Sequence, residues 1–410
     1  MNKMVIFPSK LKGVVKISGS KNAGLPIIAA SLVVAEEIKL SNVSNISDIN
    51  NMITILNKIG INARRRGSNL NINGVCNDVL LHFEEIKKFR ASYYLMSVYL
   101  ALFNKVSIHM PGGCKIGLRP IDYHLKGFES AGCEVNILDD IVEIHTKELK
   151  PFRYTLPQKS LGATVNLIIL GSKIEGKSII ENASTEPEID DLIKFINKGS
   201  AQVFRRDNNI VIYGSSLFNK KIKHKIMSDR IEAFTYLCIG VNARKIKIKN
   251  VDITHLKEPL AIFKEARLSY VIKGKNITVY KSELQPVQVL SDNYPKLSTD
   301  QMPLMYPIFS RAEGTSVFTE GIFKERFKVC DELKKVGADI TLMNDSIKIV
   351  GKEINEGADF EPTDLRGAAS LLIEAIINGK STITNLEYLE RGYENIYKKL
   401  KKLGLKYKFR

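Results

Sequence analysis

The stretch that decides the fold is residues 124–146, HLKGFESAGCEVNILDDIVEIHT. An amphipathic helical segment ends at Gly132, and two short segments of alternating polar and apolar residues follow, separated by the polar turn Asp139-Asp140. Apolar residues three and four positions apart are typical of a helix, and strict alternation is typical of a half-buried strand. The stretch therefore predicts a helix followed by a β-hairpin.

The same pattern occurs six times along the chain. The other copies are residues 55–74, 192–214, 261–281, 332–351 and, truncated at the C-terminus, 398–410. The expected helix ends are 72, 67, 67, 71 and 67 residues apart, at Gly60, Gly132, Gly199, Ala266, Gly337 and Gly404. About midway between copies lies a strand-like segment that precedes another helical stretch, as in KSIIENAS, residues 177–184. Each repeat is thus expected to be βαβαββ, which favours an α/β fold over a helical solenoid.

The domain organisation follows from the number of repeats. A chain of 410 residues usually exceeds one hydrophobic core, and six repeats suggest two domains of three. Residues before the first helical stretch are left over and are free to pair with the C-terminal repeats. We expect one domain over residues 21–228 and a discontinuous one over 1–20 plus 229–410. Two chain crossings would leave a cleft that can close, and ligands usually bind in such clefts.

Composition narrows the class of protein. Lys and Arg number 61 against 44 Asp and Glu, and the net charge of +17 favours an anionic partner, although lysines scattered over the surface also explain it. Basic patches interleaved with aromatic residues are missing, which speaks against nucleic acid. The sequence has neither an apolar run that spans a membrane nor a signal peptide, so a cytoplasmic protein without membrane insertion is expected. Five widely spaced cysteines predict reduced thiols, and we expect neither a metal nor a cofactor.

The most unusual local sequence is PGGCKIGLRP, residues 111–120. Glycines flank Cys114, and the cations Lys115 and Arg119 follow within five positions. Such a loop can swing over a substrate, and the cations can favour the thiolate or bind an anion beside it. The alternative is a turn that holds an ordinary buried cysteine.

Further candidate residues stand at expected helix starts. Lys21 and Asn22, in SGSKNAGLP, lead into an apolar helix whose N-terminus suits an anion, but the spacing is not that of a Walker A loop. Arg366 in TDLRGAA and Arg391 in ERGYE can grip a carboxylate or phosphate, or merely form capping salt bridges. Asp300, between Thr299 and Gln301, can serve as a general base or as a helix N-cap.

Taken in order, ten motifs resemble the UDP-N-acetylglucosamine 1-carboxyvinyltransferases, and the match spans nearly the whole chain. They are SGSKNAGLPI, FRASYYL, PGGCKIGLRPID, KSLGATVN, ENASTEPEI, SDRIEAFTY, STDQM, IFKERF, TDLRGAAS and ERGYENIYKKL. The cysteine loop separates this family from its sister enzyme of the shikimate pathway. The resemblance implies a two-domain inside-out α/β barrel with three repeats per domain and the active site in the interdomain cleft.

The resemblance also implies an activity and a set of site residues. The sugar 3′-hydroxyl would add to C2 of phosphoenolpyruvate, C3 would be protonated, and phosphate would leave, as the first committed step of peptidoglycan synthesis. Cys114 would be the proton donor and the thiol that fosfomycin alkylates, Asp300 the base, and Lys21 a catalytic cation. Phosphoenolpyruvate would contact Lys21, Asn22, Arg119, Arg366 and Arg391. UDP-N-acetylglucosamine would contact Asn22, Arg90, Arg119, Pro120, Ile121, Asp122, Tyr123, Lys159, Ser160, Leu161, Gly162, Asp300 and Ile322. Cleft positions of the family match Asp364 and Arg326.

Four residues depart from the family's usual pattern. Ser298 replaces a proline, Tyr294 a histidine, Tyr94 a tryptophan and Gly24 an alanine. These departures leave an alternative open, a catalytically weak paralogue with the same fold that binds the UDP-sugar. The expected oligomeric state is a monomer or a weak dimer.

Overall fold

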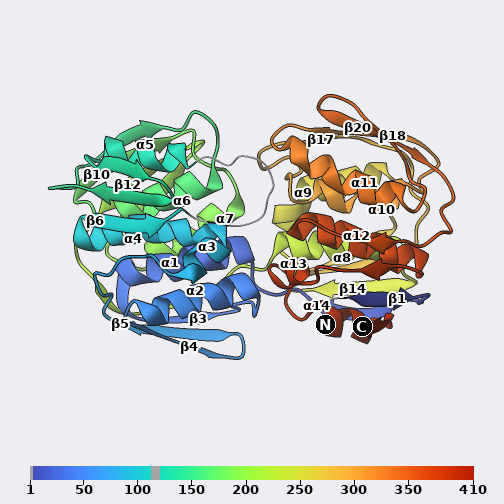
Figure 1. Cartoon of the computed structure of the whole chain (residues 1–410), viewed down its shortest axis with the longest axis horizontal. Coiled ribbons are helices and arrows are strands. Elements are labelled where there is room, and N and C mark those ends of the chain that lie inside the picture. The colour runs from blue at the N-terminus through green and yellow to red at the C-terminus, as the bar shows by residue number, and fades with distance from the viewer. Residues whose placement is uncertain (1–2, 111, 113–120) are drawn as a thin grey trace. The chain divides into compact units, whose positions relative to one another are not determined.

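The computed structural model describes residues 3–110, 112 and 121–410, so Cys114, Lys115, Arg119 and Pro120 lie outside the described residues. The chain forms two compact units, coloured along the sequence in Figure 1. The middle unit comprises the described residues from Gly19 to Met227, and the terminal unit comprises residues 3–18 and 228–410, with both ends of the chain.

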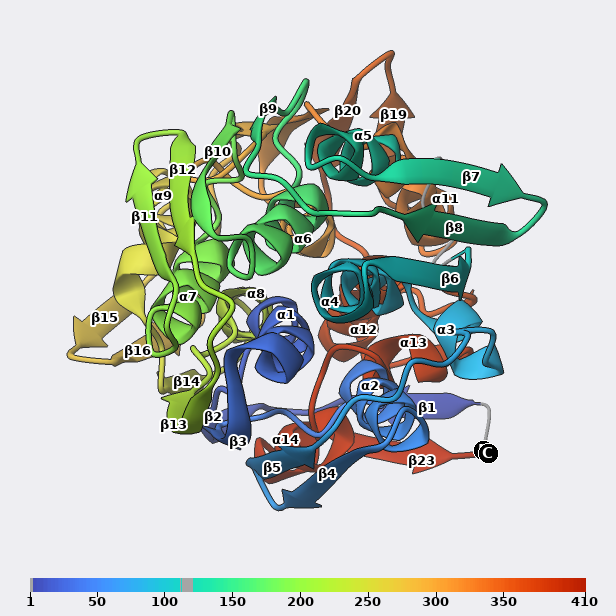
Figure 2. The ribbon, with the colours of Figure 1, turned by 90° about the vertical axis from the view of Figure 1, so that its left-hand side faces the viewer.

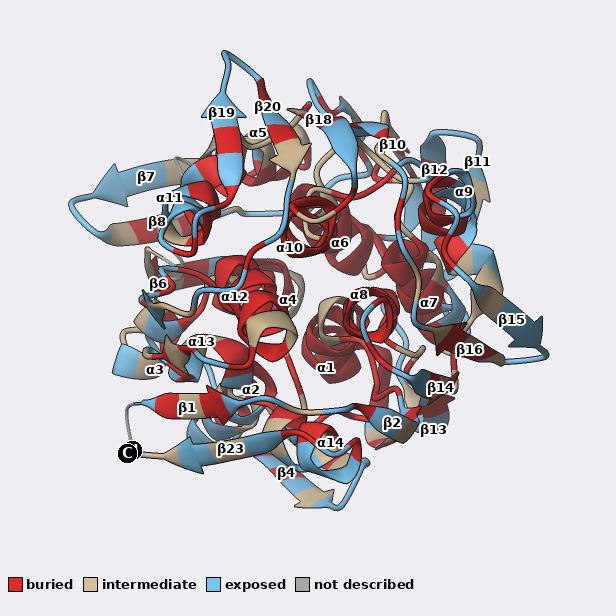
Figure 3. Cartoon of the chain, turned by 90° about the vertical axis from the view of Figure 1, so that its right-hand side faces the viewer, coloured by how far each residue is buried: buried red, intermediate tan, exposed pale blue. Residues whose placement is uncertain are grey.

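Each unit has buried helices at its centre and sheets around them. In the middle unit, α1 (Lys21–Val34), α4 (Tyr94–Phe103) and α6 (Leu161–Gly171) pack against one another (Figure 2). In the terminal unit, α12 (Leu365–Asn378) packs against α8 (Arg230–Gly240) and α10 (Tyr306–Phe309) (Figure 3). A helix that is apolar on every side must be buried on every side, which explains their central position. The expected inside-out α/β barrel is confirmed.

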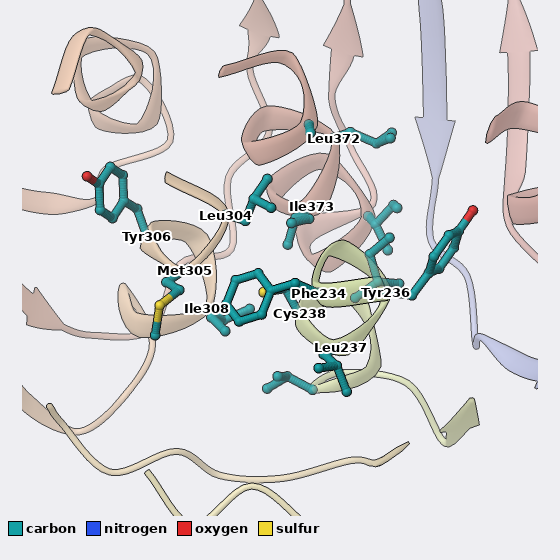
Figure 4. Close-up of a cluster of buried hydrophobic side chains, with 14 of the residues drawn as sticks. Phe234, Tyr236, Leu237, Cys238, Leu304, Met305, Tyr306, Ile308, Leu372 and Ile373 are labelled. Atoms are coloured by element: carbon teal, nitrogen blue, oxygen red, sulfur yellow. The ribbon is translucent and has the colours of Figure 1, made fainter. Parts of the chain in front are cut away.

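The core of the terminal unit consists of apolar side chains from these central helices. Phe234 of α8 lies among Leu304, Ile308 and Ile373, which come from the neighbouring helical segments (Figure 4). The outer helices are amphipathic and cover the core from outside. They are α2 (Ser47–Lys58), α5 (Asp122–Ser130), α7 (Pro187–Ile196), α9 (Lys257–Glu265), α11 (Val329–Lys334) and α14 (Ile396–Lys402). Short helices complete the chain: α3 (Glu84–Lys88), η1 (Arg90–Tyr93), η2 (Ile253–Leu256), η3 (Met302–Leu304), η4 (Lys324–Lys328) and α13 (Glu387–Glu390).

The middle unit has three sheets, with strand orders β13-β3-β5-β4, β11-β12-β10-β9 and β6-β8-β7. Their strands are β3 (Ala35–Ser41), β4 (Ile61–Arg66), β5 (Asn69–Gly74), β6 (Lys105–His109), β7 (Glu134–Leu138), β8 (Ile141–His145), β9 (Arg153–Thr155), β10 (Gly176–Glu181), β11 (Gln202–Arg206), β12 (Asn209–Gly214) and β13 (Asn219–Lys225).

The terminal unit has three more, with orders β15-β16-β14-β2, β17-β18-β20-β19 and β21-β22-β1-β23. Their strands are β1 (Met4–Phe7), β2 (Lys12–Lys16), β14 (Lys245–Lys249), β15 (Tyr270–Lys273), β16 (Asn276–Tyr280), β17 (Gln288–Ser291), β18 (Gly314–Glu320), β19 (Asp339–Leu342), β20 (Ser346–Gly351), β21 (Asp359–Phe360), β22 (Thr382–Ile383) and β23 (Lys406–Phe409).

One pairing scheme runs through the sheets. A repeat begins with a leading strand, which pairs in parallel with the strand midway through the repeat, as β9 does with β10. The hairpin that ends the repeat adds two antiparallel strands, as β12 and β11 do. In the second repeat a single parallel bridge, Leu81 to Ile108, stands in place of the leading strand. The βαβαββ repeat expected from the sequence therefore describes the observed topology.

Two leading strands are exchanged between the units. β2 directly precedes α1 of the middle unit, yet it pairs in parallel with β14 of the terminal unit. β13 directly precedes α8 of the terminal unit, yet it pairs in parallel with β3 of the middle unit. The last strand before each chain crossing is therefore hydrogen-bonded into a sheet of the unit that the chain is leaving.

The truncated sixth repeat is completed by the other end of the chain. β23 has no following hairpin strand in the sequence, and β1 takes that place between β22 and β23. Lys3 and Arg410 exchange backbone hydrogen bonds of 3.3 and 3.0 Å, so the two ends of the chain meet side by side.

The helix ends show one variation of the repeat. Gly60, Gly132, Gly337 and Gly404 have positive φ after their helices. In the fourth repeat α9 ends with Ala266 as its C-cap, as expected, and the left-handed residue is the next one, Arg267, at φ 61°. The next amide, that of Leu268, closes the helix on the Phe263 carbonyl, as Cys133 does on Phe128. Arg267 therefore takes the place that these glycines have in the other repeats.

Among the described residues, no helix combines the length and apolar character needed to cross a membrane.

Candidate functional site

On the terminal unit, the carboxylate of Asp300 pairs with two buried arginines. Arg326 Nη2 contacts Asp300 Oδ1, and Arg366 Nη2 donates to Asp300 Oδ2 at 3.0 Å. Arg326 also lies 3.6 Å from Asp364 Oδ1, and Asp364 caps α12 by accepting the amides of Arg366 and Gly367. Helix η3 begins at Met302 with Gln301 as its N-cap, so Asp300 occupies an ion-pair site rather than the helix cap that was one interpretation of its sequence context.

The charges in this cluster depend on one another. Burial opposes the charged form of Arg366, but the negative charges of Asp300 and Asp229 and the phenol of Tyr393 outweigh that penalty, so the pKa of Arg366 is raised above its ordinary value. Buried Nε of Arg366 and Nη1 of Arg326 have no hydrogen-bond acceptor among the described residues. An anion placed beside them would satisfy donors that the protein leaves open.

The loop that carries Ile322 is organised by Glu320. One oxygen of this buried carboxylate accepts the amides of Ile322 and Phe323 at 2.9 and 3.1 Å, and the other accepts from Thr299 Oγ1 at 3.0 Å. Because the Ile322 amide is engaged, a backbone contact to a ligand would fall to its carbonyl group. Arg391 is the C-cap of α13.

On the middle unit, Lys21 and Asn22 begin α1. Ser20 caps this helix by accepting from the Ala23 amide at 3.3 Å, as expected of a small polar residue at a helix start. Lys21 Nζ lies 3.1 Å from Asp48 Oδ2, in the first turn of α2. The lysine is thus held at the positive end of a helix dipole, where a bound anion would be stabilised.

The expected UDP-sugar residues of the middle unit stand at three helix starts. Arg90 begins η1 and lies 5.5 Å from the Tyr93 ring. Ile121 is the N-cap of α5, with Asp122 and Tyr123 in the first turn of that helix. Ser160 caps α6. Gly162 of α6 has no room for a side chain, because a Cβ would lie 2.4 Å from the Tyr93 hydroxyl and 3.1 Å from the His124 ring. Tyr93, His124 and Gly162 therefore bring the three helix starts together. Lys159 Nζ donates to Asn208 at 3.2 Å, and Leu161 is half-buried.

Sequence reasoning missed the buried network beneath these helix starts. Asn166 Nδ2 donates to the Tyr93 carbonyl at 3.2 Å and to His124 Nδ1 at 2.7 Å. Burial and the positive charge of Arg90 lower the pKa of His124 to about 3, so the ring is neutral at physiological pH. His124 lies inside the same loop-to-helix segment as the quoted motif PGGCKIGLRPID, but nothing local in the sequence distinguishes it from an ordinary core histidine.

The described site residues thus form two groups, one on each unit. The terminal unit gathers Asp300, Arg326, Asp364 and Arg366, and the middle unit gathers the starts of α1, η1, α5 and α6. Within the described ranges, no group of three or more His, Cys, Asp or Glu side chains is placed to hold a metal ion.

Comparisons with known proteins identify the family of the chain. The family model for EPSP synthase (3-phosphoshikimate 1-carboxyvinyltransferase) matches residues 6–400. A Halothermothrix orenii protein named UDP-N-acetylglucosamine 1-carboxyvinyltransferase is 36% identical over 398 residues, which cover 96% of each chain. A Pseudothermotoga lettingae protein of the same name is 37% identical over 416 residues, 98% of each chain.

Two solved structures show the same fold. The enolpyruvyl transferase NikO from Streptomyces tendae has a TM-score of 0.91 at 20% identity, covering 99% of this chain and 98% of that one. EPSP synthase from Acinetobacter baumannii has a TM-score of 0.80 at 18% identity over the full length of both chains. The chain belongs to the EPSP synthase family of enolpyruvyl transferases and, within it, to the UDP-N-acetylglucosamine 1-carboxyvinyltransferases.

Proposed function

We propose that this protein transfers the enolpyruvyl group of phosphoenolpyruvate to the 3′-hydroxyl of UDP-N-acetylglucosamine and releases phosphate, in the first committed step of peptidoglycan synthesis. The observation that carries the proposal is the 36% identity, over 96% of both chains, to a transferase named for this reaction. We regard the two units as the two domains of the family fold.

The proposed chemistry needs one base and one acid. The oxygen of the sugar 3′-hydroxyl bonds to C2 of phosphoenolpyruvate while Asp300 takes the proton of that hydroxyl. Cys114 donates a proton to C3. The C–O bond to phosphate then breaks, the phosphate leaves with the proton held by Asp300, and the Cys114 thiolate takes a proton back from C3 to restore the double bond. Each carboxylate oxygen of Asp300 is contacted by an arginine, and a carboxylate held in this way can act as the proton acceptor.

The cations serve the anionic substrate. Lys21, Arg119, Arg366 and Arg391 would bind its phosphate and carboxylate and stabilise the charge that develops in the transition state, and Asn22 would hold the sugar and the addition intermediate. Open donors on Arg326 and Arg366 support an anion at the terminal unit.

The UDP-sugar would bind mainly at the helix starts of the middle unit. The contacts proposed are Asn22, Arg90, Arg119, Pro120, Ile121, Asp122, Tyr123, Lys159, Ser160, Leu161 and Gly162, with Asp300 and Ile322 of the terminal unit. We further propose a cytoplasmic location, where both substrates are made, and a monomer or weak dimer.

The test is release of phosphate from phosphoenolpyruvate, measured with UDP-N-acetylglucosamine, with shikimate 3-phosphate and with no acceptor. We expect release with the UDP-sugar alone, and its loss in Cys114→Ala. Release with shikimate 3-phosphate would move the assignment to the sister activity. Tight binding of the UDP-sugar without release would identify the catalytically weak paralogue.

A further inference from the structure

A series of buried hydroxyl groups begins at Arg366 Nη1, while Nη2 of the same guanidinium contacts Asp300. Arg366 Nη1 donates to the Tyr393 hydroxyl at 3.2 Å, and that hydroxyl lies 2.9 Å from Thr235 Oγ1 on α8. Thr235 Oγ1 in turn lies 2.9 Å from the Ile231 carbonyl one turn earlier. Arg366, Tyr393 and Thr235 are all buried, so water does not replace these contacts.

One arrangement of protons lets every contact in this series be a hydrogen bond. The Thr235 hydroxyl donates its single proton to the Ile231 carbonyl, which can only accept. Thr235 Oγ1 then accepts from Tyr393, which is the direction that uses all the contacts. The Tyr393 hydroxyl thus donates its proton to Thr235, and a lone pair of the same oxygen accepts from Arg366 Nη1.

Two further properties make this arrangement a support for the arginine. Burial raises the pKa of Tyr393, so the phenol keeps the proton that it donates to Thr235. Hydrogen bonds in sequence strengthen one another, and a bond from a charged donor is stronger than one between neutral groups. Arg366 Nε already lacks an acceptor among the described residues, so loss of the Tyr393 oxygen would leave a second buried donor open.

We propose that Tyr393 and Thr235 are positioning residues for enolpyruvyl transfer. They hold the guanidinium of Arg366 so that Nη2 meets Asp300 Oδ2, and Asp300 is thereby oriented toward the hydroxyl proton that it accepts. This inference rests on the proposed function. It predicts that the hydroxyl of Tyr393 affects catalysis although it touches neither substrate.

The test uses Tyr393→Phe, Thr235→Val and their combination, with Thr235→Ser as the variant that keeps the hydroxyl. Tyr397→Phe is the matched control, because Tyr397 lies in the same unit and its hydroxyl also makes one hydrogen bond, to the Leu386 carbonyl at 3.3 Å. Steady-state phosphate release gives kcat and both KM values, and thermal melting reports stability.

We expect Tyr393→Phe to lower kcat/KM for phosphoenolpyruvate by about 10- to 100-fold, the range of one lost hydrogen bond to a charged group. Thr235→Val should lower it by a smaller factor of about 3- to 10-fold, because the bond that it removes joins neutral groups. The KM for the UDP-sugar should stay within about threefold, since its contacts lie elsewhere. The double variant should be no worse than Tyr393→Phe, because both changes interrupt the same series of hydrogen bonds, and Thr235→Ser should resemble the unaltered protein.

Two outcomes separate this inference from the proposed function. If the unaltered protein turns over and Tyr393→Phe matches Tyr397→Phe in kcat/KM, the positioning role is wrong while the function stands. If the unaltered protein does not turn over, the function is wrong, and calorimetric titration of phosphoenolpyruvate in the presence of UDP-N-acetylglucosamine decides the positioning role. Weaker binding in Tyr393→Phe than in Tyr397→Phe supports it, and equal binding overturns it.

Discussion

At the scale of single residues, His124 shows how burial selects a protonation state. Both protons of Asn166 Nδ2 are directed at acceptors, the Tyr93 carbonyl and His124 Nδ1, so this ring nitrogen must carry a lone pair. A second ring proton would face a donor in a buried site close to Arg90. The neutral ring is therefore built into the packing of α4, α5 and α6.

The predicted consequence is a pH-dependent stability. The unfolded chain takes up a proton at His124 near its ordinary pKa of 6.5, whereas the folded chain does so only near 3. The stabilisation is fully present above pH 6.5 and is lost as the pH falls toward 3, at up to about 1.4 kcal/mol per pH unit. Urea unfolding measures the free energy of unfolding at pH 7.5 and at pH 5. Its decrease between the two pH values should be about 2 kcal/mol smaller in His124→Asn than in the unaltered protein.

His145→Asn is the control, because the His145 side chain is exposed on β8, and this change should leave the pH dependence as it was. Equal pH dependence in His124→Asn and the unaltered protein would contradict the role assigned to His124.

At the scale of elements, the end of α10 is joined to α12 by a buried ion pair. Arg311 forms two parallel hydrogen bonds of 2.8 and 2.7 Å with Glu374, which is fully buried, and also donates to the Pro307 carbonyl. Such a pair need not add stability relative to apolar residues, because both charges lose water on folding. Removing Arg311 is different, since the buried Glu374 charge then keeps the neutral Asn378 amide but loses its arginine.

This difference predicts the behaviour of two variants. Arg311→Met should lower the free energy of unfolding by about 3–5 kcal/mol, and adding Glu374→Leu should restore most of that loss. Urea unfolding of both variants measures the effect. A double variant as unstable as Arg311→Met would show that the ion pair itself, and not the isolated carboxylate, decides stability here.

At the scale of the whole molecule, the break between the chain ends falls where the other sheets have a hairpin turn. β23 and β1 pair as the two strands of one repeat's hairpin, just as β15 and β16 do around Gly274. Gly274 has φ 57° with open space around it, and it lies in an exposed turn. Joining the ends and opening the chain after Gly274 would therefore move the break from one repeat to an equivalent position in another.

We expect that circular permutant, with a short glycine-serine linker between Arg410 and Met1, to melt within a few degrees of the unaltered protein. Deletion of residues 1–10 should instead unfold the terminal unit, because β22 and β23 lose the strand between them. Circular dichroism melting and limited proteolysis distinguish the two. A deletion variant as stable as the permutant would contradict the structural role of β1.

The sequence by itself determined the properties that repeat locally. Helix and strand periods, the glycines at helix ends and the recurrence near 70 residues were sufficient for the α/β class and the six repeats, because each depends on neighbouring residues. The ordered motifs also identified the family. The helix end expected at Ala266 is the C-cap of α9, and Arg267 after it adopts a left-handed conformation that usually signals glycine.

Only the tertiary structure decided which distant segments pair. The pairing of β13 with β3, the insertion of β1 between β22 and β23, the two arginines on Asp300 and the hydroxyl groups beside Arg366 all join residues far apart in the sequence. The pairing of the N-terminal segment with a C-terminal repeat, seen in β2 and β14, was expected from the sequence. Taken alone, Asp300 resembles a helix cap and Tyr393 a core aromatic residue, since no local pattern records their partners. Their roles follow from burial, because a buried polar group must find an acceptor or donor wherever the fold supplies one.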